Sequence, residues 1–233
     1  MLDPRAARYR VECLKLGKTY PPDVAALREV SLAAAAGELV FITGPSGAGK
    51  STLLKLIGRR ELPDQGVVML DGRDPARCKG AELQALRRRI GVAYQDFKLL
   101  PRLSAAANVA LALEVAYRPG DFIRRRVGEL LTRLELTGKE QRPAADLSLG
   151  EQQRLAIARA AANHPDLLLA DEPTGNLDAA AGRLVLELFR ELAAGGTTII
   201  AATHDEKLYG GGEHRILHLD AGILTEDPHV RAA

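Results

Sequence analysis

Short apolar runs alternate with amphipathic stretches along most of this chain, a pattern that predicts a sheet covered by helices. Residues 39–43 are predicted as a buried strand, and residues 51–57 directly after them begin a predicted helix. Two alternating stretches, 9–16 and 24–33, are predicted as strands of a separate edge sheet that turns at Pro21-Pro22. Further strands of the core sheet are predicted near residues 67–70, 90–94, 167–170, 197–202 and 214–219.

The middle of the chain, from about residue 96 to 160, is rich in Ala and Leu and has helical periodicity. Two helices are predicted over residues 104–116 and 121–136, and residues 138–146 would connect them to a further helix that runs to about Asn163. Later in the chain, Gly210-Gly211-Gly212 predicts a flexible turn before a last hairpin.

These patterns predict a single α/β domain over residues 1–233. We expect a core of about 1–95 and 161–233, in which helices flank a mixed sheet beside an antiparallel edge subdomain. A helical lobe of about 96–160 would be inserted into that core.

One loop carries the most specific chemistry. It completes the pattern G-x-x-x-x-G-K-[ST] between a predicted strand and helix, which indicates a nucleoside triphosphate as ligand. Its glycines let backbone N–H groups turn toward phosphate, and the helix N-terminus adds its positive dipole end. Lys50 is expected to reach the β- and γ-phosphates, and the Ser51 hydroxyl to bind Mg²⁺. The expected nucleotide-binding residues of this loop are Gly44, Pro45, Ser46, Gly47, Ala48, Gly49, Lys50, Ser51 and Thr52.

A second predicted strand ends in two carboxylates, Asp171 and Glu172. Acidic residues after a strand usually form a solvated turn, but the phosphate loop upstream favours a Walker B element. Asp171 would then hold the metal, and Glu172 would orient or deprotonate water.

The stretch Leu147–Arg154 opens an Ala-rich predicted helix. Ser148 fits as its N-cap and Glu151 follows three residues later, so the isolated stretch is explained by a plain capping box. Its place in the chain adds a second interpretation. Six motifs follow one another: the phosphate loop, Gln95, L-S-x-G-E-Q, the two carboxylates, Gly175 to Asp178, and His204.

In this order the chain resembles the nucleotide-binding subunit of an ABC (ATP-binding cassette) ATPase, from about residue 9 to 224. The resemblance implies a P-loop NTPase fold of ABC type, with ATP and Mg²⁺ as ligands. It also implies a head-to-tail homodimer that traps two ATP·Mg²⁺. Each nucleotide would lie between the phosphate loop of one subunit and the signature residues of the other, here Ser148, Leu149, Gly150, Glu151 and Gln152.

The resemblance also implies individual roles. Lys50 and Glu172 would act in catalysis, His204 would contact the γ-phosphate, and Gln95 would contact Mg²⁺ or water and move with the helical lobe. The metal ligands would be Ser51, Gln95 and Asp171. Tyr20 matches the position where the family stacks an aromatic ring on adenine, although a chance surface Tyr is the alternative. Leu149 departs from the common L-S-G-G-Q or L-S-G-G-E-Q, and we expect tuned rather than abolished activity.

Composition limits the partners. The 32 basic and 30 acidic residues give a net charge of +2, which gives no support for general nucleic-acid binding. Cys13 and Cys78 stand far apart, which favours reduced thiols over a redox or zinc site.

We find no signal peptide and no apolar run near the ~18 residues of a membrane span. If the protein works at a membrane, another chain must hold it there. The basic clusters 87–89 and 124–126 are interpreted as solvated helix faces, with a secondary role against anionic lipid left open.

The strings 41–57, 88–91 and 95–101 resemble the branch of the family that works in bacterial cell division with an integral membrane subunit. We therefore expect a cytoplasmic protein, peripheral on the inner face of the cell membrane through that partner. Residues 169–178 are shared with ATPases of lipoprotein release and macrolide export, so a transporter ATPase remains the main alternative. A repair or translation ATPase would need a coiled-coil insertion or tandem cassettes, and a small-molecule kinase explains the phosphate loop alone. The apolar cluster after Gln95, formed by Phe97, Leu99 and Leu100, is the expected docking point of the membrane subunit, with a buried core contact as the alternative for at least one of the three.

Overall fold

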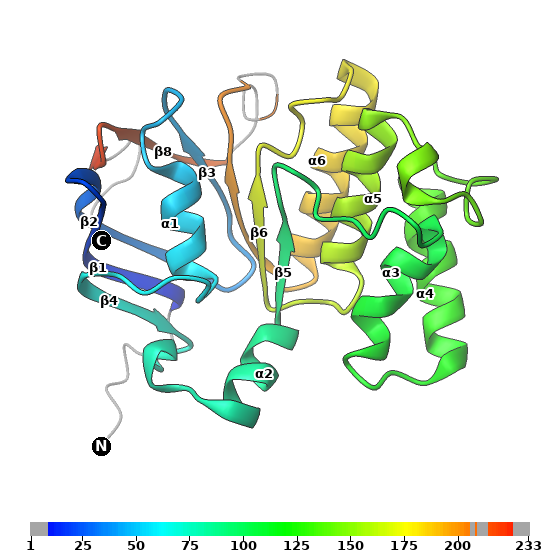
Figure 1. Ribbon diagram of the computed structural model, residues 1–233, viewed down its shortest axis with the longest axis horizontal. Coiled ribbons are helices and arrows are strands. Elements are labelled where there is room, and N and C mark those ends of the chain that lie inside the picture. The colour runs from blue at the N-terminus through cyan, green and yellow to red at the C-terminus, as the bar shows by residue number, and fades with distance from the viewer. Residues whose placement is uncertain (1–8, 206–207, 209–213, 226–233) are drawn as a thin grey trace.

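The computed structural model describes residues 9–205, 208 and 214–225. Two sheets lie side by side, with helix α1 (Lys50–Ile57) between them (Figure 1). The larger sheet has the strand order β5-β6-β7-β3-β8-β9, and only β9 is antiparallel to its neighbour. This mixed sheet confirms the predicted fold class. Its strands are β3 (Leu39–Thr43), β5 (Ile90–Ala93), β6 (Leu167–Asp171), β7 (Thr198–Ala202), β8 (Arg215–Asp220) and β9 (Ile223–Thr225).

The smaller sheet is antiparallel, with the order β2-β1-β4, and comprises β1 (Tyr9–Tyr20), β2 (Val24–Ala35) and β4 (Gln65–Leu70). The prediction that residues 67–70 belong to the core sheet is therefore wrong, because Val68 pairs with Cys13 of β1. Val68 and Leu70 are buried, whereas Val67 and Met69 are half-buried, an alternation typical of an antiparallel sheet. The core strands β3, β6 and β7 are instead apolar almost without a break.

The remaining helices lie on the other face of the large sheet or at its lower edge (Figure 1). Helix α3 packs on α4 and α5, and α5 also contacts β5 and α6. These helices are α2 (Gly80–Arg88), α3 (Ala105–Glu114), α4 (Gly120–Arg133), α5 (Leu149–Ala161) and α6 (Ala179–Ala194), with short 3-10 turns at Pro75–Arg77 and Ala144–Asp146.

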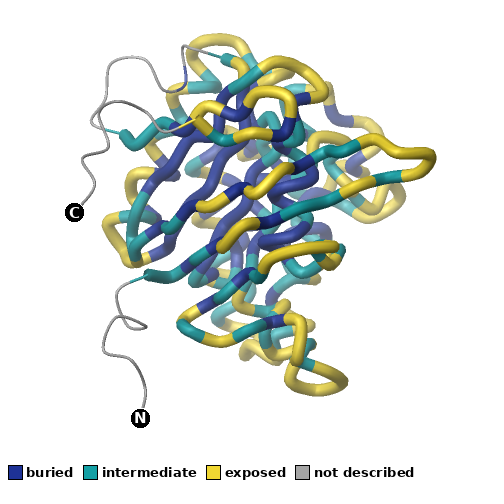
Figure 2. Tube along the Cα trace, turned by 90° about the vertical axis from the view of Figure 1, so that its left-hand side faces the viewer, coloured by how far each residue is buried: buried dark blue, intermediate teal, exposed yellow. Residues whose placement is uncertain are grey.

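Alternation along the central strand β3 separates two apolar cores. Leu39 and Phe41 face the core shared with α3 to α6, whereas Val40 and Ile42 face the core shared with α1 and the small sheet. Figure 2 shows the buried residues concentrated in the interior of the molecule and the exposed ones mostly at its periphery. The predicted turn at 210–212 lies outside the described residues.

Candidate functional site

The phosphate loop joins the end of β3 to the start of α1, as the sequence predicts. Two of its glycines have positive φ and stand against backbone carbonyls. At Gly44, with φ 140°, a Cβ would lie 1.9 Å from the carbonyl oxygen of Leu219. At Gly49, with φ 108°, a Cβ would lie 2.3 Å from the carbonyl oxygen of Ala26. Neither position has room for a side chain, so glycine is required for this loop conformation.

Lys50 begins α1 and is 7% exposed. Its Nζ donates hydrogen bonds to the carbonyl oxygens of Gly44 at 2.7 Å and Pro45 at 3.0 Å. The same nitrogen lies 4.0 Å from Oε1 of Glu172. The loop therefore holds a nearly buried cation at its centre, where it can meet an anionic ligand.

Glu172 and His204 follow two neighbouring parallel strands, β6 and β7, whose last residues Asp171 and Ala202 pair. The N–H of Glu172 donates to the carbonyl oxygen of Ala202 at 2.8 Å, and the N–H of His204 donates to Oε2 of Glu172 at 3.3 Å. His204 Nδ1 lies 2.9 Å from Oε1 of the same carboxylate. Glu172 has φ 50°, the left-handed region, so its backbone turns sharply where the strand ends. The carboxylate is thus held on several sides, a condition for a group that orients a reactant.

Asp171 stands at the end of β6, next to Glu172. Burial, the largest cause, raises the pKa of its carboxyl, and the charge of Glu172 adds to this, whereas the Ser51 hydroxyl and Lys50 lower it. Its buried Oδ1 has no hydrogen-bond partner among the described residues. Buried polar atoms are nearly always paired, so this oxygen is available to a ligand such as a cation.

Most of the predicted residues meet in one cleft with a volume of about 660 Å³. That volume is within the range of ligand pockets in proteins. The predicted residues that line it are Tyr20, Pro45, Ser46, Gly47, Gly49, Lys50, Ser51, Thr52, Gln95, Glu172 and His204. Gly44, Ala48 and Asp171 belong to the same loop and strand but are not part of the cleft surface.

Tyr20 is the last residue of β1, and its hydroxyl donates to Oε2 of Glu61 at 2.5 Å. Burial is the main cause that raises the pKa of the Tyr20 phenol, followed by this hydrogen bond, which lowers the pKa of Glu61. The ring is therefore anchored by its hydroxyl at the edge of the cleft, and Lys18 Nζ lies over the ring, 5.6 Å from its centre.

The signature residues do not line this cleft in the described part of the chain. Ser148 is the N-cap of α5: its Oγ accepts from the N–H of Glu151 at 3.3 Å, and Oε2 of Glu151 accepts from the N–H of Ser148 at 3.0 Å. The capping box is confirmed. Lys139 also pairs with Glu151, and Gln152 Nε2 donates to the carbonyl oxygen of Leu147. Leu149 is 61% exposed and Ser148 is exposed beside it, whereas Gly150 is half-buried, with a Cβ there 3.1 Å from the carbonyl oxygen of Asn176, so the helix start presents Ser148 and Leu149 at the surface.

Sequence reasoning missed one wall of the cleft. Ala26 and Arg28 of β2 line it together with the β8–β9 turn at Ala221 and Gly222. The N–H of Gly222 donates to the carbonyl oxygen of Ala48 at 3.0 Å, and its own carbonyl accepts from the N–H of Arg28 at 2.8 Å. Because these contacts join backbone atoms of distant segments, the Ala-Gly turn was the only feature of the sequence that could have indicated this wall of the cleft.

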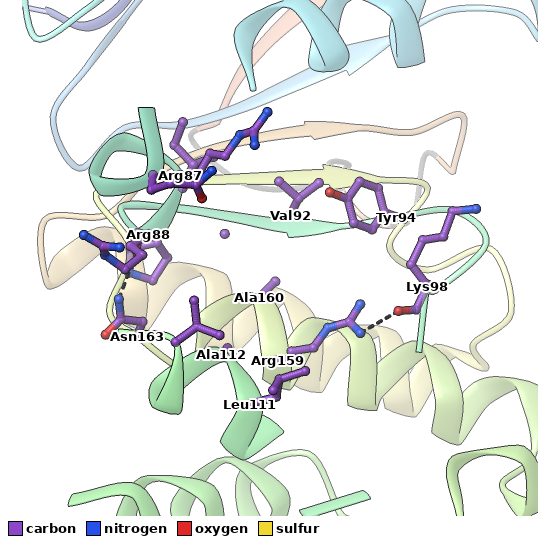
Figure 3. Close-up of a pocket in the computed structure, with 15 residues that line it drawn as sticks. Arg87, Arg88, Val92, Tyr94, Lys98, Leu111, Ala112, Arg159, Ala160 and Asn163 are labelled. Carbon is purple, nitrogen blue, oxygen red and sulfur yellow. Dashed lines mark hydrogen bonds between the residues drawn. The ribbon is translucent and has the colours of Figure 1, made fainter. Parts of the chain in front are cut away.

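A second groove, with a volume of about 410 Å³, adjoins the loop after β5. Figure 3 shows Val92 and Tyr94 from β5 and its end facing Leu111, Ala112, Arg159 and Ala160 from the helices opposite. Tyr94 and Lys98 line this groove, whereas Gln95 between them lines the first cleft. One short loop therefore borders both hollows.

The apolar cluster after Gln95 divides between core and surface. Leu99 packs against the core of α3 to α6, Phe97 is half-buried, and Leu100 is 42% exposed. Arg159 of α5 donates to the carbonyl oxygen of Phe97 at 2.7 Å. It also donates to the carbonyl oxygen of Lys98 at 2.6 Å, the bond drawn in Figure 3. Burial lowers the pKa of the Arg159 guanidinium. The loop is thus fixed to α5 by two charge-assisted hydrogen bonds.

Comparison with known proteins agrees with this geometry. The family model for ABC transporter matches residues 27–175. Cell division ATP-binding protein FtsE of Escherichia coli (strain K12) is 46% identical over 209 residues, which are 90% of this chain and 94% of that protein. FtsE of Bacillus subtilis (strain 168) is 42% identical over 217 residues, 93% of this chain and 95% of that protein.

Solved structures agree as well. The dimeric structure of a post-hydrolysis state of the ATP-binding cassette MJ0796, bound to ADP and Pi, has a TM-score of 0.86 and 38% identity, and covers 93% of this chain and 98% of that one. None of the helices in the described part of this chain has the length and apolarity that crossing a bilayer requires.

Proposed function

Since this chain belongs to the ABC transporter family as one of its ATPases, we propose that it drives a membrane partner in bacterial cell division, the process named for its FtsE relatives. The partner would be an FtsX-like integral membrane protein. The observation that carries the proposal is the convergence of Lys50, Glu172 and His204 on one cleft at the phosphate loop. The protein would then lie at the inner face of the cell membrane, held there by its partner.

The proposed reaction is in-line attack of water on the γ-phosphate of ATP. Lys50 turns from the loop carbonyls to the β- and γ-phosphate oxygens, which offer it a full negative charge. Glu172 orients the attacking water and accepts its proton, because the backbone around it fixes the carboxylate. His204 contacts the γ-phosphate from the neighbouring strand, and Tyr20 stacks on adenine at the other end of the cleft.

The residues present also fit Mg²⁺. Ser51, Gln95 and Asp171 would hold it, since they supply the oxygen ligands that this ion prefers. When bound, it neutralises charge on the β- and γ-phosphates. The buried Asp171 oxygen without a partner among the described residues supports this assignment.

The free start of α5 supports a head-to-tail homodimer. Ser148 and Gly150 of one subunit would complete the nucleotide site of the other, with Leu149 beside them. MJ0796, at 38% identity, is dimeric in its solved structure. Hydrolysis would then loosen the dimer, and the helical lobe over residues 96–160 would move relative to the core.

The second groove is the proposed docking point of the membrane subunit. Its lining residues Tyr94 and Lys98 flank Gln95, so a change at the γ-phosphate is transmitted to the partner through three or four residues of chain. Phe97 and Leu100 at the edge of that loop offer the partly exposed apolar surface for a short helix of the partner.

Phe97→Asp together with Leu100→Asp tests this surface. The doubly substituted protein should bind ATP normally and fail to capture its membrane subunit in pull-downs from detergent-solubilised membranes. Leu14→Asp with Leu62→Asp is the control, since these side chains, on the small sheet and beside it, match Leu100 in exposure. Unchanged capture by the first variant means that the docking surface is elsewhere. If the captured partner is a solute-translocating permease, the cell-division role is wrong and the ATPase assignment stands.

A further inference from the structure

Positive charge is concentrated in one part of this nearly neutral chain. Residues 73–126 contain 12 Lys and Arg but 5 Asp and Glu, a net charge of +7, whereas the whole chain has +2. The rest of the chain therefore has a net charge of −5. An excess of this size in one segment creates a local field that the total charge conceals.

The fold brings part of this segment together in an arginine–aromatic rim, formed by Arg88, Tyr117, Arg118, Phe122 and Arg125. The Arg88 guanidinium lies 5.9 Å from the centre of the Tyr117 ring, and those of Arg118 and Arg125 lie 5.5 and 5.7 Å from the Phe122 ring. The rim thus connects the end of α2 to the turn between α3 and α4 and to the first turns of α4 (Figure 1).

Asn163 fixes the two sides of the rim to each other. Its Nδ2 donates to the carbonyl oxygen of Arg88 at 2.9 Å, and its Oδ1 accepts from Arg118 Nε at 2.8 Å. Figure 3 shows Arg88 and Asn163 together at one end of the second groove. The arrangement is therefore a built surface and not a set of independent solvated side chains.

The rim is also exposed and incompletely neutralised. Tyr117 is 86% exposed and Val115 beside it 55%, and the Arg125 side chain is 69% exposed with Glu129 at 3.7 Å. Arg88 and Arg118 have no carboxylate partner within ion-pair distance among the residues that the structure describes. A tyrosine ring and an aliphatic side chain among arginines, two of them without a carboxylate partner in the described part of the chain, is the composition found where proteins meet the membrane–water interface.

We propose that the arginine–aromatic rim binds anionic phospholipid headgroups. The inference rests on the proposed function for the orientation of the rim toward the membrane, because Arg88 and Val115 also line the groove assigned to the membrane subunit. A partner seated in that groove would bring the rim to the lipid surface. An acidic peptide is the less favoured ligand, since a peptide needs no exposed apolar side chains among the cations.

Vesicle binding by the purified full chain tests the proposal. Wild type should co-sediment with vesicles of phosphatidylglycerol and phosphatidylcholine but not with phosphatidylcholine alone, and 0.5 M salt should release it. Each arginine near an anionic surface contributes about five-fold in partitioning, so Arg88→Gln, Arg118→Gln and Arg125→Gln together should weaken binding by roughly 100-fold. The control combines Lys15→Gln, Arg142→Gln and Arg190→Gln, which remove the same charge at exposed positions outside the rim and should bind almost as wild type.

A second variant does not depend on the triple substitution. The chain contains no Trp, so Tyr117→Trp places a single reporter in the rim. Its emission should shift to shorter wavelength with phosphatidylglycerol vesicles, and brominated lipid should quench it. An unshifted spectrum, equal binding by the rim and control variants, or no binding by wild type would each overturn the proposal. So would binding of poly-glutamate without binding of vesicles.

ATP turnover without vesicles separates this proposal from the proposed function. Arg118→Gln with Arg125→Gln, which leaves Arg88 in the groove, should hydrolyse ATP at the wild-type rate. If vesicle binding fails while turnover and partner capture persist, the rim proposal alone is wrong. If vesicles bind but the captured partner is not a division protein, the proposed function alone is wrong.

Discussion

Two substitutions of Ser148 can distinguish its structural role from its role in catalysis. Its hydroxyl caps α5 and is also proposed to enter the partner subunit's nucleotide site. Ser148→Ala removes both roles. Ser148→Asn keeps the cap, since Asn is as good an N-cap as Ser, but removes the hydroxyl. The two variants should therefore agree in activity and differ in stability.

The structure sets the size of the stability effect. Loss of an N-cap costs about 0.5–2 kcal/mol. The Ser148 cap bond is long, at 3.3 Å, and Glu151 keeps its ion pair with Lys139 in the variant, so the lower part of that range is expected. For a chain of this size, about 1 kcal/mol lowers the melting temperature by roughly 2–4 °C. Ser148→Ala should show this decrease, and Ser148→Asn should melt within about 1 °C of wild type.

Turnover should respond differently. Removal of one donor that stabilises charge in the transition state typically costs about 10²–10³ in rate, so both variants should lose activity to that extent. Phosphate release at saturating ATP measures turnover, and thermal unfolding of the same samples measures stability. Wild-type turnover by Ser148→Asn would refute the proposed role in the partner's site and leave Ser148 as a helix cap.

Three further predictions concern the cleft. Lys50→Ala should lose ATP binding or turnover, and unchanged phosphate release would contradict the site assignment. Glu172→Gln should bind ATP but hydrolyse it about 10²–10⁴ times more slowly, because it lacks the base. In size-exclusion chromatography this variant should be dimeric only with ATP. A monomer whose elution does not change with ATP would argue against the trapped dimer. Asp171→Asn should need much more Mg²⁺ for hydrolysis at fixed ATP, whereas a superimposable Mg²⁺ titration would exclude a metal role.

The parts of the fold that the sequence predicted well are those with strong local signals. A continuous apolar run followed by Gly44 predicts a buried strand and a loop, and Ser148 with Glu151 predicts a helix start, because each signal depends on neighbours in sequence. Strand β4 was placed in the wrong sheet because four apolar residues at 67–70 fit both sheets. Only the alternating burial at Val67 and Val68 distinguishes them, and that burial depends on what covers the strand.

The site shows the same limit. Gly222 supports the phosphate loop through a backbone hydrogen bond to Ala48, and Arg159 holds the carbonyls of Phe97 and Lys98 across 62 and 61 residues. Backbone acceptors impose no residue type on the segment that carries them. No pattern in a single sequence could therefore have indicated the acceptors of Arg159, although its bonds position the loop on which Gln95 lies.

Arg159 also gives a physical basis for a link between the two ends of α5. The helix follows its N-cap, the signature serine Ser148, and runs from Leu149 to Ala161, so Arg159 near its end lies about 16 Å along the axis from Ser148. A shift of the loop after Gln95 must either break two hydrogen bonds to a half-buried cation or displace α5 with it. Such bonds each contribute about 1.5–3 kcal/mol, and breaking both leaves a guanidinium without acceptors in a desolvated place. Helix α5 is packed on α3, α4 and β5, so a movement of the loop that keeps both bonds would carry these packed elements with it, and Ser148 with them.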